Sequence, residues 1–134
     1  MSVTLLYYAA GAAIGMLTLA FFWRAPVGAL AENGYVALAC MLMIYVGAHL
    51  VASDLDRIIF ETAFALLVLG GAMVLRSRWP VGVGVLVLGH ALYDFVLGHD
   101  AGVADWYPPM CVGYDLVVGA GFVFLMSRRR SGAS

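Results

Sequence analysis

The sequence has very little charge. Asp, Glu, Lys and Arg together make up 11% of the 134 residues, whereas 64% are hydrophobic. Soluble domains carry about 25% charged and roughly 45–50% apolar residues. This scarcity of charge excludes an ordinary soluble domain and predicts an integral membrane protein. The net charge is -1 and no basic face is available to bind phosphate groups, so we do not expect the chain to bind nucleic acid.

Cysteine is also scarce, with Cys40 and Cys111 as its two occurrences. The predicted helices place them toward opposite sides of the membrane, whereas the α-carbons of a disulfide pair lie within roughly 7 Å of each other. We therefore expect two separate thiols. The N-terminal Met1-Ser2-Val3-Thr4 has no basic residue and so lacks the basic region of a secretory signal. The first apolar segment is expected to be a retained membrane span.

What the sequence does contain is apolar runs of membrane length. There are five, each of about 19–21 residues, and an α-helix of that length crosses roughly 30 Å of hydrocarbon. We predict an all-α bundle of five transmembrane helices in a single domain, residues 1–134. The helices are expected at about 3–23, 34–53, 57–75, 81–98 and 109–127, with a connection containing Glu32-Asn33-Gly34 between the first two.

The arginines predict the orientation of these helices. Counting along alternating spans puts only Arg57 on one side of the membrane, and the other side holds Arg24, Arg76, Arg78 and the tail at 128–130. Cytoplasmic loops carry an excess of Lys and Arg. The C-terminus is therefore expected in the cytoplasm and the N-terminus outside, in a multi-pass protein of the cell (inner) membrane.

Two local patterns predict how helices meet and begin. Gly11 and Gly15 form a GxxxG pattern, which lets another helix approach closely and offers a face for a homodimer. Ser53 and Asp54 are suitable N-cap residues for the third helix, because their side chains accept hydrogen bonds from its first free N–H groups.

Ionisable side chains interrupt the apolar runs at one depth. Counting at 1.5 Å per residue from the outer ends puts His90 at roughly 12 Å, and the other four members of this layer at about 6–9 Å. These four are His49, Glu61, Asp94 and Asp115. A charge near the centre of a membrane helix costs on the order of 2.5–3.5 kcal/mol, so such residues usually face a protein interior and serve a function. The pattern predicts a polar pocket open toward the outer face.

The spacing within this layer favours acid–base chemistry. His90 and Asp94 are four residues apart and share one helix face. The segment that starts at Tyr93-Asp94 is similar to the one that starts at Tyr114-Asp115, which puts a second carboxyl group at the same level. Two carboxyl groups held at different pKa values can act as general acid and general base. The predicted catalytic residues are Asp94 and Asp115 as that pair, with Glu61 and His90 to orient groups, act as ligands or activate water.

The predicted substrate is a lipophilic small molecule that reaches the pocket from the bilayer. Hydrolysis, isomerisation and cyclisation all fit, and the sequence does not choose among them. The residues expected to line the pocket are His49, Tyr45, Tyr93, Tyr114 and Trp106. A divalent metal ion is an alternative, since imidazole and carboxylate are common ligands, although no HExxH spacing is present. Its candidate ligands are His90, Asp94, Glu61 and Asp115.

Three other roles compete with an enzyme. A proton or metal-ion carrier would need polar residues that continue to the cytoplasmic side, and the inner halves of the helices have almost none. An accessory subunit of a membrane complex would use the same groups for assembly. The polar layer could also serve as a mutually satisfied network that orders helix packing, which is an expensive use of four buried ionisable groups.

The His90-x-x-x-Asp94 element resembles the last His-containing motif of the CAAX-protease-like intramembrane hydrolases. The resemblance covers five residues of one helix and implies hydrolysis within the membrane. That family's paired glutamates with a following arginine are lacking, because Glu61 stands alone and Arg57 precedes it. The small multi-span sterol isomerases are similar in placing His and carboxylates in a helical bundle, but no motif matches residue by residue. The sequence is therefore assigned to neither family.

Overall fold

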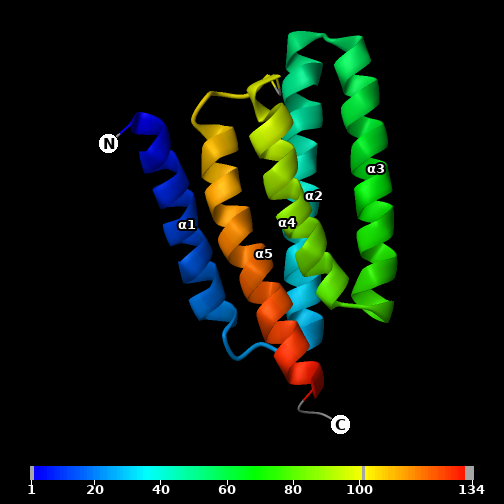
Figure 1. The fold of residues 1–134 in the computed structure, drawn as a ribbon. Coiled ribbons are helices and arrows are strands. Elements are labelled where there is room, and N and C mark those ends of the chain that lie inside the picture. Colours follow the sequence, from blue (N-terminus) through cyan, green and yellow to red (C-terminus); the bar gives the residue numbers. More distant parts are fainter. Residues whose placement is uncertain (1, 101, 132–134) are drawn as a thin grey trace.

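The protein is an all-helical bundle (Figure 1). A computed structural model describes residues 2–100 and 102–131, apart from the side chains of residues 99, 130 and 131. Five α-helices follow one another, with one turn of 3-10 helix, η1, at Gly98–Asp100. The α-helices are α1 (Val3–Phe22), α2 (Val27–Ala52), α3 (Leu55–Arg78), α4 (Val81–Leu97) and α5 (Tyr107–Ser131).

Four of these helices are long and apolar enough to cross a membrane, namely α1, α2, α3 and α5. They indicate a membrane-embedded protein, as the composition predicts. The fifth helix, α4, is apolar but has 17 residues. At 1.5 Å per residue it measures about 26 Å, slightly less than the roughly 30 Å of a bilayer's hydrocarbon core.

The prediction that Glu32-Asn33-Gly34 forms a connection is wrong, because these residues lie inside α2. The connection is shorter and lies around Pro26, whose extended backbone precedes the first residue of α2. Gly34 is a contact residue, since a Cβ there would lie 2.8 Å from Val83 Cγ1 on α4. Glu32 is an ion-pair partner, with Oε2 2.7 Å from Arg76 Nη1 on α3. At this point, therefore, the glycine and the Glu32–Arg76 ion pair mark contacts between helices and not a turn.

The other predicted helices are found with shifted ends. Helix α3 starts two residues earlier than expected and extends to Arg78, and the Asp54 side chain caps it by accepting from Arg57 N at 3.2 Å. Helix α5 starts at Tyr107, because Pro108 and Pro109 lie in its first turn, where the missing N–H groups cost little. Helices α1 and α4 end within a residue of their expected ends.

The helices run alternately in opposite directions, which gives the bundle two distinct ends (Figure 1). The end that carries Ser2, the α2–α3 turn and the α4–α5 connection is called the loop end. The opposite end is called the arginine end, and it carries Arg24, Arg76, Arg78, Arg128 and Arg129. There Arg129 donates hydrogen bonds to the carbonyl groups of Trp23 and Ala25 and so holds the end of α5 against the α1–α2 connection.

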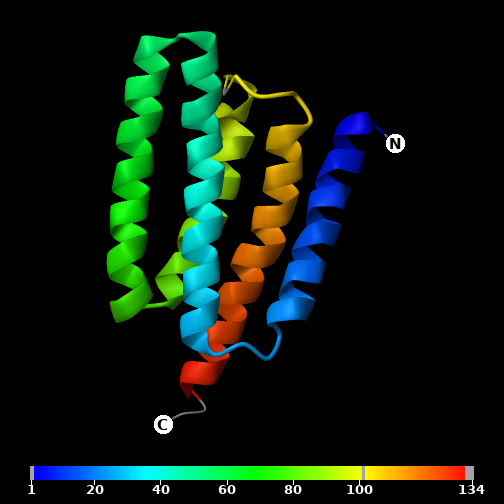
Figure 2. The same ribbon diagram turned by 180° about the vertical axis from the view of Figure 1, so that it is seen from behind.

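Helix α1 packs along α5 at the edge of the bundle, while α2 packs against α3, α4 and α5 (Figure 2). Gly11 and Gly15 form the α1 side of this contact, where a Cβ on Gly15 would lie 3.1 Å from Tyr114 O. The predicted close helix approach is therefore confirmed. It is made within the chain, so the GxxxG face is covered by α5 and does not offer the homodimer surface that the sequence suggested.

Helices α4 and α5 also approach closely at glycines. A Cβ on Gly119 would lie 2.9 Å from Leu88 N, and one on Gly84 would lie 3.0 Å from Val123 N. This contact brings the residues that follow Leu88 on α4 near those that precede Gly119 on α5.

The apolar core fills the arginine half of the bundle. It includes Leu30, Leu38, Val83, Val87, Val118, Phe122 and Met126, all fully or almost fully buried. The buried ionisable residues lie toward the loop end, so the two halves differ in chemistry. Cys40 is exposed on α2 and Cys111 is buried on α5, and both are free thiols as expected.

Candidate functional site

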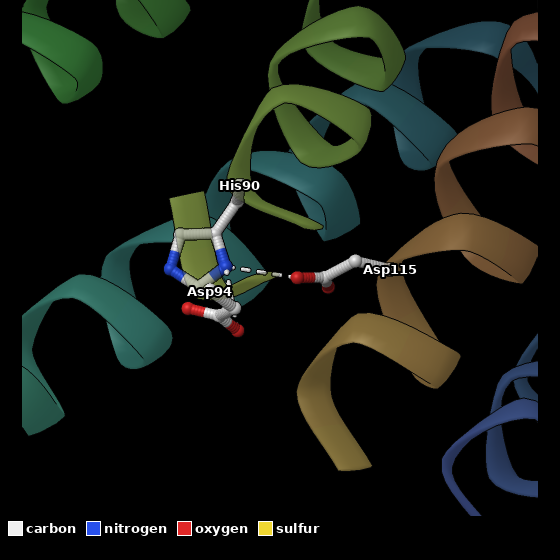
Figure 3. Close-up of side chains that lie close together, drawn as sticks. All are labelled: His90, Asp94 and Asp115. Atoms are coloured by element: carbon white, nitrogen blue, oxygen red, sulfur yellow. Dashed lines mark hydrogen bonds and ion pairs between the residues drawn. The ribbon is translucent and has the colours of Figure 1, made fainter. Parts of the chain in front are cut away.

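Three ionisable side chains from two helices converge inside the bundle. His90 and Asp94 are one turn apart on α4, and Asp115 comes from α5 across the glycine contact (Figure 3). The three residues are 4%, 3% and 0% exposed, respectively. His90 Nδ1 lies 2.8 Å from Asp115 Oδ2 and 3.5 Å from Asp94 Oδ2. One ring nitrogen thus lies between two carboxyl groups.

The geometry assigns the protonation of the His90 ring when Asp115 is ionised. An ionised carboxylate only accepts hydrogen bonds, so Nδ1 must carry the hydrogen in the 2.8 Å contact. In a neutral imidazole the other nitrogen, Nε2, then has a free lone pair. Nε2 is buried and has no hydrogen-bond partner among the described residues. It lies on the side of the ring turned away from Asp115 (Figure 3).

Tyr45 fixes the second carboxyl group. Its hydroxyl donates to Asp94 Oδ1 at 2.5 Å, and the tyrosine itself is fully buried on α2. Its ring lies nearly parallel to the His90 ring, with centroids 6.0 Å apart and an interplanar angle of 15°. Tyr45, Asp94, His90 and Asp115 therefore form one continuous polar network across α2, α4 and α5.

Glu61 belongs to a separate pair. The Tyr93 hydroxyl on α4 lies 2.6 and 2.7 Å from the two carboxylate oxygens of Glu61 on α3, and both residues are buried. The Tyr93 ring stacks on Phe64 at 4.7 Å. Glu61 is thus held next to the network without being one of the three groups that converge on His90 Nδ1.

The remaining residues predicted to line the pocket have other neighbours. His49 is buried near the end of α2 beneath Gly102, and its Nε2 has no hydrogen-bond partner in the part of the chain that the structure describes. Tyr114 packs against the apolar core. Trp106 is 44% exposed and contacts Tyr107 edge-on. The two similar Tyr-Asp segments therefore bring their aspartates together, while their tyrosines face different neighbours.

Sequence analysis missed Tyr107 as a neighbour of the network. Its ring meets Tyr45 edge-on at 6.0 Å. The residue precedes Pro108 and Pro109 and lies outside the predicted helix at 109–127, whereas in the structure it begins α5. Proline is common in the first turn of a helix, so the Pro108-Pro109 pair is the sequence signal that could have put Tyr107 at the start of this helix.

The buried carboxyl groups of this site have no arginine partner among the described residues. None of the hydrogen bonds or ion pairs of Asp94, Asp115 and Glu61 in the described part of the chain involves an arginine. One oxygen each of Asp94 and Asp115 is buried without a hydrogen bond to the described residues. Buried charges are costly unless they are paired. The site therefore needs a proton or a bound cation among these groups.

Two cavities border the network. One of about 240 Å³ is lined by His90 together with Leu42, Phe64, Val68, Leu86 and Gly89, and is apolar apart from the histidine. The other, of about 310 Å³, opens near the loop end between α1, α4 and α5, and its lining includes Tyr8, Asp94 and Asp105. His90 and Asp94 are bonded members of one network and border different cavities.

The same three groups could hold a metal ion. One nitrogen of His90 and one oxygen each of Asp94 and Asp115 all lie within 4.8 Å of one another. A nitrogen and two carboxylate oxygens suit zinc, manganese or iron. Glu61 does not belong to this group of donors, and its carboxylate accepts from Tyr93 instead.

Comparison of the chain with protein-family models, curated proteins and solved structures finds no match.

Proposed function

We propose that the protein is a small membrane enzyme that carries out acid–base chemistry on a lipophilic molecule, with His90 as the general base. The observation that carries the proposal is the histidine itself. Its Nδ1 is bonded to Asp115, and its buried Nε2 has no hydrogen-bond partner among the described residues, while the His90 side chain lines an apolar cavity. A carboxylate that accepts from Nδ1–H orients the imidazole and stabilises the imidazolium that forms when Nε2 takes a proton.

In this mechanism Nε2 removes a proton from one atom of the bound molecule, and the imidazolium, after exchange of its proton with solvent, donates a proton to another atom. Asp115 offsets the positive charge of the imidazolium between the two steps. Asp94, bonded to Tyr45 and 3.5 Å from Nδ1, adds a second negative charge that favours the same state. Isomerisation requires only these two proton transfers. Hydrolysis needs a water molecule as well, and the apolar lining favours isomerisation or cyclisation over it.

The proposal includes a topology. All five helices cross the inner membrane, α4 among them, so the protein is multi-pass with its N-terminus outside and its C-terminus in the cytoplasm. The concentration of arginines at one end of the bundle supports this orientation. The apolar core in the arginine half supports a pocket closed toward the cytoplasm, and hence an enzyme over a carrier.

The test compares the full-length protein with His90→Gln after both are reconstituted with a total lipid extract in deuterated water. Mass spectrometry should find a lipophilic species that the wild-type protein converts and labels with deuterium, because the base exchanges its proton with solvent. His90→Gln should show neither change. Cys40→Ala, at an exposed position of α2, is the matched control and should behave as wild type. Identical lipid profiles for the wild-type protein and His90→Gln would overturn the proposal.

A divalent metal site is the second candidate, supported by the three converging donor atoms and by the absence of an arginine from their described contacts. Elemental analysis of the purified protein tests it. This candidate predicts about one zinc, manganese or iron per chain, lost in Asp94→Asn and Asp115→Asn. Metal-free protein that still converts the lipophilic species would exclude it and leave the acid–base mechanism in place.

A further inference from the structure

The apolar cavity beside His90 lies between three helices. Leu42 of α2 and His90 are buried parts of its lining, while Phe64 and Val68 of α3 are half-buried. On the α4 side it reaches Gly89, which is exposed. The cavity therefore leads from the outer surface of the bundle to His90, the proposed base.

Gly89 leaves this surface open. A Cβ at that position would have no atom within 4 Å, whereas the glycines at the α4–α5 contact have close neighbours. The α3 surface beyond the cavity is apolar and exposed, as Leu67 at 75% shows. In a membrane-embedded protein, hydrocarbon is what surrounds such a surface.

The volume of the cavity limits the size of the molecule that it can hold. About 240 Å³ is below the roughly 300–1,000 Å³ of pockets that enclose a whole drug-sized ligand. A longer lipophilic molecule can therefore place one segment in the cavity and leave the rest in the bilayer.

The cavity has a polar boundary toward the loop end. Phe64, one of its lining residues, stacks on Tyr93, whose hydroxyl is bonded to Glu61. His90 is the other polar neighbour. An occupant would thus meet His90 directly, while the Tyr93–Glu61 pair lies behind Phe64.

We infer that the cavity admits a hydrocarbon segment of a lipophilic molecule sideways from the bilayer, past Gly89 and between α3 and α4, so that the reacting atoms lie on that segment. The inference rests on the proposed function and names its substrate class: molecules that react within a hydrocarbon chain or ring rather than at a large polar headgroup. Gly89 is the residue that controls access.

A photoreactive long-chain fatty acid, with a diazirine at the end of its chain, tests this access directly. The full-length protein is reconstituted in phosphatidylcholine vesicles with the probe and irradiated, and the labelled residues are identified by mass spectrometry. We expect labels on Phe64, Val68 and Leu86. Gly89→Leu should reduce these labels about tenfold, equivalent to about 1.4 kcal/mol of binding. Leucine forms helix better than glycine, so this variant should fold.

Gly71→Leu on α3 is the matched control, because Gly71 is also exposed and has no atom within 4 Å of an added Cβ. It should label as wild type does. Equal labelling in Gly89→Leu, or labels confined to exposed residues such as Leu67, would overturn the inference. His90→Gln should keep the labels while losing turnover. If the wild-type protein is labelled in the cavity but shows no turnover, the proposed function alone is contradicted. If it shows turnover but no labels in the cavity, this inference alone is contradicted.

Discussion

His90 Nδ1 lies 2.8 Å from Asp115 Oδ2 across the contact between α4 and α5, and it donates to this oxygen when Asp115 is ionised. The two residues are 25 positions apart in the chain. They meet because Gly84 and Gly119 let the two helices approach until their main chains are nearly in contact. A helix contact made of glycines thus brings the histidine within hydrogen-bond distance of Asp115.

Replacing Asp115 tests the orientation of the imidazole. Asp115→Asn keeps the size of the side chain, but its amide can either accept from Nδ1–H or donate to an unprotonated Nδ1, so the preference for the Nδ1–H tautomer is weakened. We expect turnover to fall by about 10²–10⁴-fold, the usual contribution of general acid–base catalysis. Nitrogen NMR of labelled histidine should show a changed balance between Nδ1 and Nε2 protonation. Asp56→Asn, at an exposed position, is the control. An unchanged tautomer in Asp115→Asn would contradict the assignment.

Removing the Tyr45 hydroxyl tests the second part of the network. Tyr45→Phe leaves Asp94 Oδ1 without its 2.5 Å donor in a fully buried position. A lost hydrogen bond to a charged group costs about 1.5–3 kcal/mol. Unfolding in mixed micelles should show a loss of this size. Tyr7→Phe removes a tyrosine hydroxyl on α1, outside the network, and is the control. A similar loss of stability in Tyr7→Phe would mean that the bond to Asp94 does not explain the loss in Tyr45→Phe.

The α4–α5 contact should tolerate no added carbon at Gly119. A Cβ there would lie 2.8 Å from Leu88 Cγ and 2.9 Å from Leu88 N, so one helix must shift. We expect Gly119→Ala to cost about 1–3 kcal/mol of unfolding free energy and to weaken the His90–Asp115 bond, visible in the same NMR signals. Gly70→Ala has open space and should be neutral or stabilising, because alanine favours helix. Equal effects of the two substitutions would refute the packing explanation.

Single cysteines test the topology and the crossing of α4. In a chain with Cys40→Ser and Cys111→Ser, Asp105→Cys and Arg78→Cys place thiols at exposed positions on either side of α4. A membrane-impermeant maleimide should modify Asp105→Cys in intact cells and Arg78→Cys only after permeabilisation. The reverse pattern would invert the proposed orientation. Modification of both in intact cells would mean that α4 does not cross.

Much of the fold follows from runs of apolar residues, because a run of about 20 has one stable form in a bilayer, the helix. The failure at Glu32-Asn33-Gly34 shows the limit of that reasoning. A glycine beside polar residues is compatible with a turn and equally with a close helix contact, and only the Val83 and Arg76 side chains on other helices distinguish the two. The same applies to Gly11 and Gly15, whose partner helix proved to be α5.

The sequence by itself indicated a membrane-embedded protein, the presence of five helices and the half of the bundle that holds the buried ionisable residues, because composition and a rise of 1.5 Å per residue depend on the chain alone. Only the tertiary structure decided which of those residues touch. Tyr45 bonds to Asp94 while Tyr114 turns to the apolar core, and Glu61 pairs with Tyr93 instead of joining His90. The physical reason is that lateral contacts depend on the rotation of each helix and on its neighbours. Those are set by how glycines and large side chains fit between helices that are distant in sequence.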